Sequence, residues 1–202
     1  MLIGRRQFAI SAAYGLASLA VSQSCSKKDQ PELIDIHQHL NYKNRGDEDF
    51  IAHQNRMGIT RSVLLPAGSY LDVDSTHFGE SNGLAANISV TEAAYQLTQK
   101  HPDKFVYFCC EVPDTEGAIK TMEGWLKKGA VGIGEMKFNI DCDSAPMIRV
   151  YELADEYQVP VLIHFQHGMY NHGFDRFHKI LERFPKVNFI GHAQTWWGNI
   201  DA

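Results

Sequence analysis

The chain has 202 residues, a length typical of one domain. Hydrophobic residues make up 44% of it and charged residues 21%, which excludes a mainly disordered chain, a collagen-like repeat and a polytopic membrane protein. The net charge of −5 excludes a strongly basic surface, so we expect no nucleic-acid partner. Four cysteines are too few for a fold held together by disulfides.

Residues 1–25 are typical of a targeting segment and are not expected to join the folded domain. Arg5 and Arg6 precede an uncharged stretch, residues 8–22, that is rich in small and apolar side chains. This stretch is too short and too weakly apolar for a membrane-spanning helix, and it fits the hydrophobic region of a secretory signal better. The paired arginines before Phe8 resemble a twin-arginine signal, which predicts the twin-arginine export machinery as a partner.

Three fates of this targeting segment stay open. Cleavage near Ser22 would release the protein, whereas cleavage before Cys25 would leave a cysteine for a lipid anchor. An uncleaved apolar helix that tethers the protein is the third alternative. We therefore expect an exported protein, periplasmic or membrane-anchored, with a linker at residues 26–32 and a folded domain over residues 33–202.

Beyond residue 32, short apolar runs alternate with amphipathic stretches. The runs are often β-branched, as buried parallel strands are, and they predict strands over residues 33–39, 62–66, 105–112, 131–138, 160–165 and 187–192. The intervening stretches predict helices over residues 49–57, 90–100, 115–128, 144–158 and 174–184. Asp114 and Ser144 are the expected N-caps of two of these helices.

The spacing of the predicted strands indicates an α/β fold built from strand–helix units. Most steps between strand starts are 26 to 29 residues, close to the roughly 30 residues of a βαβ unit. The step from residue 62 to residue 105 is longer, which predicts an inserted loop over residues 68–89. Six units fit either a doubly wound sheet or most of a TIM (β/α)8-type barrel, which typically needs about 250 residues.

Chemically reactive side chains recur where the predicted strands end. His37 and His39 alternate onto one face of the first strand, and His164 and His192 end the fifth and sixth strands. Glu135 ends the fourth strand, two residues before Lys137. Because parallel α/β proteins place their sites at the carboxyl ends of the strands, we expect a metal or proton-transfer site there.

Several of these residues also have a purely structural interpretation. His164 alone would more often be a core histidine, and Glu135 with Lys137 could form a salt bridge inside the barrel. His167, in the loop after the fifth strand, could touch substrate or simply be solvated. Trp196 is better explained as part of a pocket wall or of the packed core than as a catalytic residue.

As a set, these motifs resemble the amidohydrolase superfamily. The runs LIDIHQHL, VPVLIHFQHG and NFIGHAQTWWG are most similar to its amidohydrolase-related branch, which comprises metal-dependent hydrolases and decarboxylases on a TIM barrel. The resemblance extends over residues 33–198. The family also has an aspartate at the end of strand eight, and Asp201 comes too early to be it. We therefore expect a C-terminally incomplete barrel with about six of the eight units.

The resemblance assigns roles to individual residues. It implies that His37, His39 and His164 bind a divalent metal, usually zinc, as one or two ions. Glu135 matches the glutamate that some members use as a further metal ligand. His192 would bind a second ion or activate the attacking water as the catalytic residue. Lys137 would contact a substrate carboxylate or act as a structural partner.

The expected activity is metal-dependent hydrolysis of a C–N or C–O bond in a small-molecule substrate. Imidazole and carboxylate ligands leave a position on the metal for water, whose pKa the ion lowers towards about 7. Two alternatives stay open. One is non-oxidative decarboxylation of a carboxylate substrate, and the other is an inactive fragment that binds metal without turnover.

Overall fold

The computed structural model describes residues 32–68 and 88–200. By its internal contacts the chain separates into residues 1–32 and residues 33–202, and the description below concerns the second unit. The expected targeting segment, Cys25, most of the expected inserted loop and Asp201 lie outside the described residues. Within the described ranges, no helix is both long enough and apolar enough to cross a membrane.

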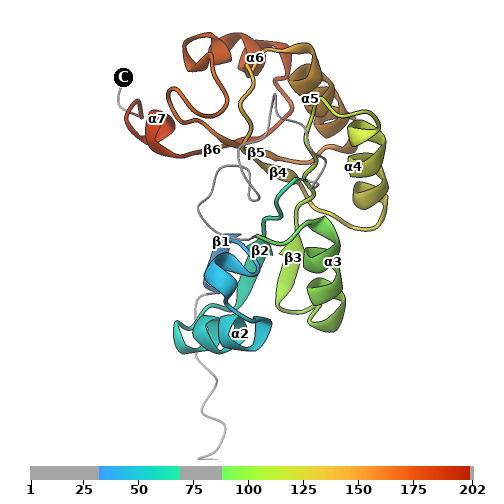
Figure 1. Ribbon diagram of the computed structural model, residues 1–202, viewed down its shortest axis with the longest axis vertical. Coiled ribbons are helices and arrows are strands. Elements are labelled where there is room, and N and C mark those ends of the chain that lie inside the picture. The colour runs from blue at the N-terminus through green and yellow to red at the C-terminus, as the bar shows by residue number, and fades with distance from the viewer. Residues whose placement is uncertain (1–31, 69–87, 201–202) are drawn as a thin grey trace, which may run out of the picture. The chain divides into compact units, whose positions relative to one another are not determined.

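Six strands run parallel and follow one another in chain order (Figure 1). They are β1 (Ile34–Gln38), β2 (Arg61–Leu64), β3 (Phe105–Tyr107), β4 (Ile133–Met136), β5 (Val161–His164) and β6 (Phe189–His192). The ladder β1-β2-β3 is joined to the ladder β4-β5-β6 by a parallel bridge between Cys109 and Ile133. A doubly wound sheet would reverse its strand order at a switch point, so the unbroken chain order favours the barrel alternative.

A helix follows each strand, and the sequence predicts all of them except the short helix after β6. The helices are α2 (Asp47–Arg56), α3 (Thr91–Lys100), α4 (Ala118–Lys127), α5 (Ala145–Tyr157), α6 (Phe177–Arg183) and α7 (Gln194–Trp197), with short 3-10 helices η1 (Tyr42–Asn44) and η2 (Phe174–Arg176). The predicted helix over residues 174–184 is thus divided between η2 and α6.

Of the two predicted helix caps, Asp114 is wrong and Ser144 is confirmed in its position only. Helix α4 begins three residues later than predicted, after Gly117, whose φ of 81° is accessible to glycine at little cost, so Asp114 is not the cap. Ser144 does occupy the N-cap position of α5, but its side chain makes no capping hydrogen bond. The Ser144 hydroxyl is instead buried without a partner.

The helices pack apolar faces against the strands. In α5, Met147, Val150, Tyr151 and Ala154 are buried at the spacing of three or four positions that the sequence predicts for an amphipathic helix, and Leu153 is buried beside them. After β5, the rings of Phe165, Phe174 and Phe177 meet edge to face, with centroids 4.9 and 5.1 Å apart in the two pairs that include Phe165. Burying each large apolar side chain contributes roughly 1.5–3 kcal/mol, which holds the strand ends in place.

Gly134 allows β4 to approach β5 closely, just before Glu135. Its φ of +145° disfavours other residues, and a Cβ at this position would lie 2.8 Å from the Leu162 carbonyl oxygen. The backbone therefore places Glu135 directly beside the end of β5, where His164 lies.

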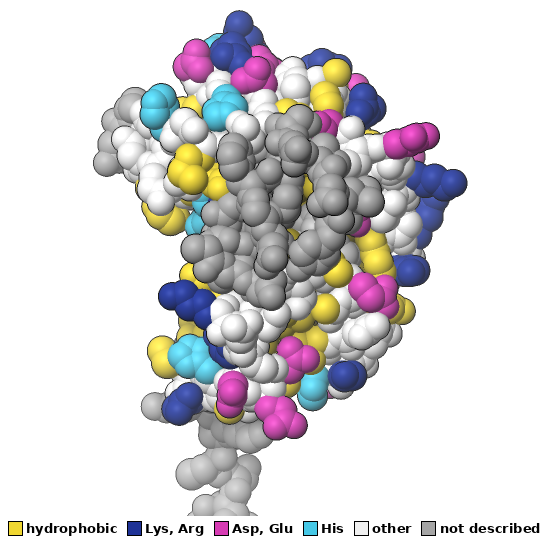
Figure 2. All heavy atoms as spheres, viewed as in Figure 1, with side chains coloured by type: hydrophobic (Ala, Val, Ile, Leu, Met, Phe, Trp, Pro, Cys, Tyr) yellow, Lys and Arg dark blue, Asp and Glu magenta, His cyan; other side chains and the backbone are white. Residues whose placement is uncertain are grey.

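The surface carries charges of both signs. On the face shown in Figure 2, Lys and Arg side chains are interspersed with Asp and Glu side chains around the rim. One pair joins Arg176 of η2 to Asp143 by two hydrogen bonds of 2.7 and 2.9 Å. This bidentate contact ties the segment after β4 to the segment after β5.

Candidate metal centre

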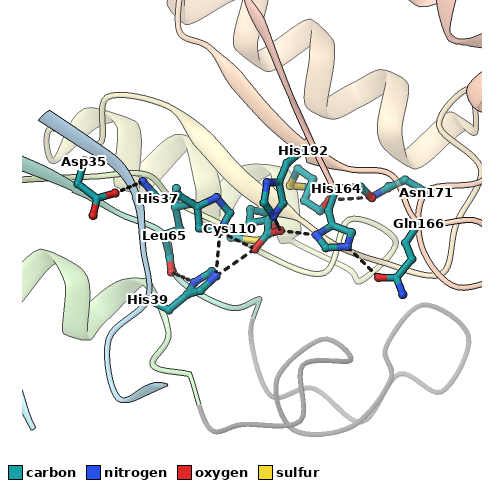
Figure 3. Close-up of polar contacts among 11 residues, drawn as sticks. Asp35, His37, His39, Leu65, Cys110, His164, Gln166, Asn171 and His192 are labelled. Carbon is teal, nitrogen blue, oxygen red and sulfur yellow. Dashed lines mark hydrogen bonds and ion pairs between the residues drawn. The ribbon is translucent and has the colours of Figure 1, made fainter. Parts of the chain in front are cut away.

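The carboxyl ends of four strands bring five titratable side chains together (Figure 3). His37 and His39 come from the end of β1, and Glu135 comes from β4. His164 and His192 end β5 and β6, where they are direct partners in the parallel register. The positions that the sequence assigned to one rim of the sheet therefore do lie at one rim.

Glu135 lies at the centre of this group and is only 4% exposed. One of its oxygens, Oε1, is 2.5 Å from His164 Nδ1 and 3.6 Å from His192 Nε2. The other, Oε2, is 3.2 Å from His39 Nε2 and 3.6 Å from His37 Nε2. Four imidazoles thus surround one buried carboxylate.

The surroundings of Glu135 keep it ionised. Burial alone would raise its pKa, but contacts with His164, His37 and His39 hold the pKa well below its usual range. Burial lowers the pKa of His192 to about 4, although the negative charge of Glu135 acts in the opposite direction. At neutral pH the cluster therefore offers an ionised carboxylate and a neutral His192.

His37 of β1 and His39, which directly follows β1, point the same ring atom towards the cluster. The Nε2 atoms of His37 and His39 are 3.1 Å apart. His39 Nδ1 lies 2.8 Å from the Leu65 carbonyl oxygen, which can only accept a hydrogen bond. Nδ1 therefore carries the proton when His39 is neutral, and Nε2 then presents a lone pair to Glu135, whereas a doubly protonated ring donates to Glu135 from Nε2.

The donor atoms fit a divalent cation. Ligand atoms of His37, Glu135 and His192 all lie within 4.8 Å of one another. The lone pair of His39 faces the Glu135 oxygen at 3.2 Å, an arrangement that a cation between the two would relieve. Imidazole nitrogens with one carboxylate oxygen are the ligand types that zinc prefers.

His164 is placed differently from the other three histidines. Its Nδ1 faces Glu135, and its Nε2 lies 3.0 Å from Gln166 Oε1, so both ring nitrogens contact oxygen atoms. Among the described residues, the group of ligand atoms within 4.8 Å contains His192 and does not contain His164. That group does not contain His39 either, and it includes His192, to which the resemblance assigned a second ion or the attacking water.

Several supporting residues were not found from the sequence. Asn171, in the loop after β5, donates from Nδ2 to the Met136 and His164 carbonyl oxygens, and so ties the end of β4 to the end of β5. Cys110 contacts the Glu135 carbonyl oxygen through Sγ at 3.2 Å. None of these contacts follows a periodic sequence signal.

The three residues considered for substrate contact lie in different surroundings. Lys137 is 5% exposed, and its Nζ lies 5.0 Å from the centre of the Tyr170 ring. No ion pair joins Lys137 to Glu135, so the salt bridge considered from the sequence is not formed. His167 is exposed and lines a pocket of about 400 Å³ after β5. Trp196 packs on Phe165 and covers Gly191, where an added Cβ would lie 1.9 Å from the indole.

Comparisons with solved structures show similarity to TIM-barrel proteins. An uncharacterized TIM-barrel protein from Bordetella bronchiseptica matches with a TM-score of 0.52 and 14% identity, over 72% of this chain and 50% of that one. A protein described as amidohydrolase II matches with a TM-score of 0.53 and 17% identity, over 84% and 70%. A 2,6-dihydroxybenzoate decarboxylase from Rhizobium matches with a TM-score of 0.53 and 11% identity, over 80% and 66%.

Comparison of the sequence with known families and proteins identifies no family. No family profile and no curated protein sequence matches this chain. The chain spans between 50% and 70% of the lengths of the three proteins above, and identities of 11–17% show the fold alone. The protein therefore has the fold of part of a TIM barrel, with about six strand–helix units.

Proposed function

We propose that this protein belongs to the amidohydrolase superfamily and acts as a metal-dependent hydrolase on a small-molecule substrate. The observation that carries this proposal is the convergence of four imidazoles on one buried carboxylate at the carboxyl ends of β1, β4, β5 and β6. In TIM-barrel enzymes that end of the strands holds the catalytic groups.

His37, His39, Glu135 and His192 are the residues that would hold the ion, with His164 beside them. A bound divalent cation would polarise the bond to be cleaved and lower the pKa of a water that it holds. Glu135 supplies negative charge without needing to lose a proton, because its pKa is already low. Zinc is the ion we expect, since the ligand atoms are mostly imidazole nitrogens.

His164 and His192 are the candidates for moving a proton during the reaction. His192 is neutral at neutral pH and half-buried, so it can accept a proton from a water if it is not occupied as a ligand. His164 contacts Glu135 through Nδ1 and Gln166 through Nε2. These two contacts fix the ring orientation that a general acid or base needs.

Non-oxidative decarboxylation is the second candidate reaction. The similarity to the Rhizobium decarboxylase supports it at the level of fold. The same imidazole and carboxylate groups would then hold a cation that orients a carboxylate substrate. Product analysis with a hydrolysable lactone or amide and with an aromatic carboxylate distinguishes the two reactions, because only decarboxylation releases carbon dioxide.

The test of the proposed function is metal content compared between two double variants. We expect about one equivalent of zinc in the wild type and in a His53→Ala/His178→Ala control, whose histidines lie on the exposed faces of α2 and α6. His37→Ala/His39→Ala should lose the metal while keeping its circular dichroism spectrum. Equal zinc content in the two double variants would contradict the proposed site.

The targeting proposal is separate from the catalytic one. We propose export through the twin-arginine pathway, supported by Arg5 and Arg6 before the weakly apolar residues 8–22. Anchoring by a lipid at Cys25 is the alternative to release into the periplasm.

A further inference from the structure

The side chain of Asn171 joins the ends of β4 and β5, and Figure 3 shows it beside His164. Its Nδ2 donates to the Met136 carbonyl oxygen at 2.6 Å and to the His164 carbonyl oxygen at 2.8 Å. The last registered pair between the two strands is Met136 with Ile163, so the amide joins the strands where their ladder stops. Met136 directly follows Glu135. The two bonded carbonyls therefore lie in the backbone beside Glu135 and His164, whose side chains are 2.5 Å apart.

The loop that carries Asn171 is itself fixed to the segment after β4. The Asn171 backbone N–H donates to the Phe138 carbonyl oxygen at 2.8 Å, and that of His172 donates to the Ile140 carbonyl oxygen at 2.9 Å. The Cys142 N–H donates back to the His172 carbonyl oxygen at 2.8 Å. Asn171 has a φ of 46°, in the left-handed region that asparagine adopts more readily than most residues. The backbone thus holds the amide in a fixed place between the strand ends.

The chemistry of the amide fits this double contact. An asparagine NH2 group has two donors, one for each carbonyl, whereas an ionised aspartate has none and a serine has one. Asn171 is 2% exposed, and within the described part of the chain its Oδ1 is buried without a hydrogen-bond partner. An unpaired buried acceptor is unfavourable for stability. The two donors of Nδ2, rather than the whole amide, are therefore what this position uses.

We propose that Asn171 is a positioning residue of the metal centre, which sets the distance between the Glu135 carboxylate and the His164 ring by holding the Met136 and His164 carbonyls together. The inference rests on the proposed function, because it concerns the geometry of the same site. Glu135 also faces the other three histidines of the cluster, so a shift of its backbone alters all of these contacts. Partners that orient metal ligands in this way typically change metal affinity by about 10–100-fold when they are removed.

The first readout is the contact between Glu135 and His164 in the chelator-treated protein. An ionised carboxylate can only accept, so the proton of this contact lies on His164 Nδ1, in a short charge-assisted hydrogen bond. The proton of such a bond gives a far-downfield NMR signal, which reports the distance between the two groups and not the stability of the fold. We expect this signal in the wild type. It should disappear or move upfield in Asn171→Asp, which keeps the shape without the donors, and in Asn171→Gly, which accepts the left-handed backbone.

The second readout is zinc affinity, measured by titration against a competing chelator. We expect Asn171→Asp and Asn171→Gly to bind zinc at least about 10-fold more weakly than the wild type. A wild-type signal together with wild-type zinc affinity in Asn171→Asp would overturn the proposal.

Two controls separate positioning from a general loss of stability. Val150→Ala shortens a buried side chain of α5 and should lower stability without touching the strand ends. Asn44→Gly removes another asparagine with a left-handed backbone, which is exposed. Both controls should keep the downfield signal and the zinc affinity of the wild type. Equal losses in Val150→Ala and Asn171→Asp would show that Asn171 acts through stability alone.

A measurement on the wild type tests the proposal even if the Asn171 variants do not fold. Both Nδ2 protons of Asn171 should exchange slowly with solvent, because each is held by a buried carbonyl. Fast exchange of these protons would overturn the proposal. A wild type that binds no zinc contradicts the proposed function, while the downfield signal still tests Asn171. Zinc binding that is equally tight in the wild type and the Asn171 variants contradicts this inference alone.

Discussion

The closest contact in the cluster joins Glu135 of β4 to His164 of β5, with 2.5 Å between Oε1 and Nδ1. Glu135 occupies the position that lets one carboxylate reach histidines from three other strands. Its buried charge is stabilised by these histidines, and their ring positions depend on it in turn. Changes at Glu135 should therefore affect both metal binding and the stability of the metal-free protein.

Glu135→Gln should lower zinc affinity by more than the roughly 10–100-fold that loss of an outer contact to a metal ligand costs. It should also lower the free energy of unfolding of the metal-free protein by about 1–3 kcal/mol, because the buried hydrogen bond between His164 Nδ1 and Glu135 Oε1 loses its charged acceptor. Zinc titration and urea denaturation measure the two effects. The control is Glu182→Gln on the exposed side of α6, and equal effects of the two substitutions would contradict the central position of Glu135.

Gly134→Ala should destabilise the protein by about 2 kcal/mol or more, because the new Cβ would meet the Leu162 carbonyl oxygen and φ is +145°. Gly124→Ala is the matched control. Gly124 lies inside α4 with nothing within 4 Å of an added Cβ, so this change should stabilise the helix by roughly 0.5–1 kcal/mol. Urea denaturation of both variants checks the prediction, and equal effects would show that β4 does not approach β5 as described.

The imidazole of His192 should titrate near pH 4 in the metal-free protein, well below its ordinary value, and the C2 proton signal in NMR spectra measures this. The folded state binds this proton less readily than the unfolded state does. This contribution to stability is therefore complete above about pH 6.5 and is lost as the pH falls towards 4. Titration near pH 6.5 in the chelator-treated protein would contradict the half-buried position of His192.

The double substitution Arg5→Lys/Arg6→Lys should block export while leaving the folded domain unchanged. The physical basis is the sequence signal alone, in which two arginines precede a short, weakly apolar segment. Fractionation of cells that express the wild type and the variant measures delivery to the periplasm. Equal periplasmic amounts would show that another route or another part of the chain directs the protein.

The sequence predicted the fold because its signal is repetitive. Apolar runs at a nearly constant pitch required parallel strands with helices between them, and the strands do follow one another in chain order. Strand lengths were less accurate. The third strand, expected to reach residue 112, ends at Tyr107, and Cys109 then bridges to Ile133 of β4 instead of continuing the first ladder. Residues 108–112 remain mostly apolar, so the hydrophobic pattern of the sequence does not show where the ladder ends.

The sequence also predicted that the histidines and Glu135 lie at one rim of the sheet. The carboxyl ends of parallel strands lie at the same rim, and this does not depend on the conformation of the loops. It could not place Gln166 or Asn171. Their positions depend on loop conformations, including the left-handed backbone of Asn171, which no periodic pattern encodes. Nor could spacing show that Glu135, rather than one of the histidines, lies at the centre.

The central claim is that the histidines surrounding Glu135 hold a divalent cation. A crystal structure of the zinc-treated protein, with anomalous diffraction measured on both sides of the zinc absorption edge, tests it most directly. We expect one strong anomalous peak about 2.0–2.2 Å from ring nitrogens of His37 and His39 and from an oxygen of Glu135. A fully zinc-treated crystal with no anomalous peak among these residues would contradict the account.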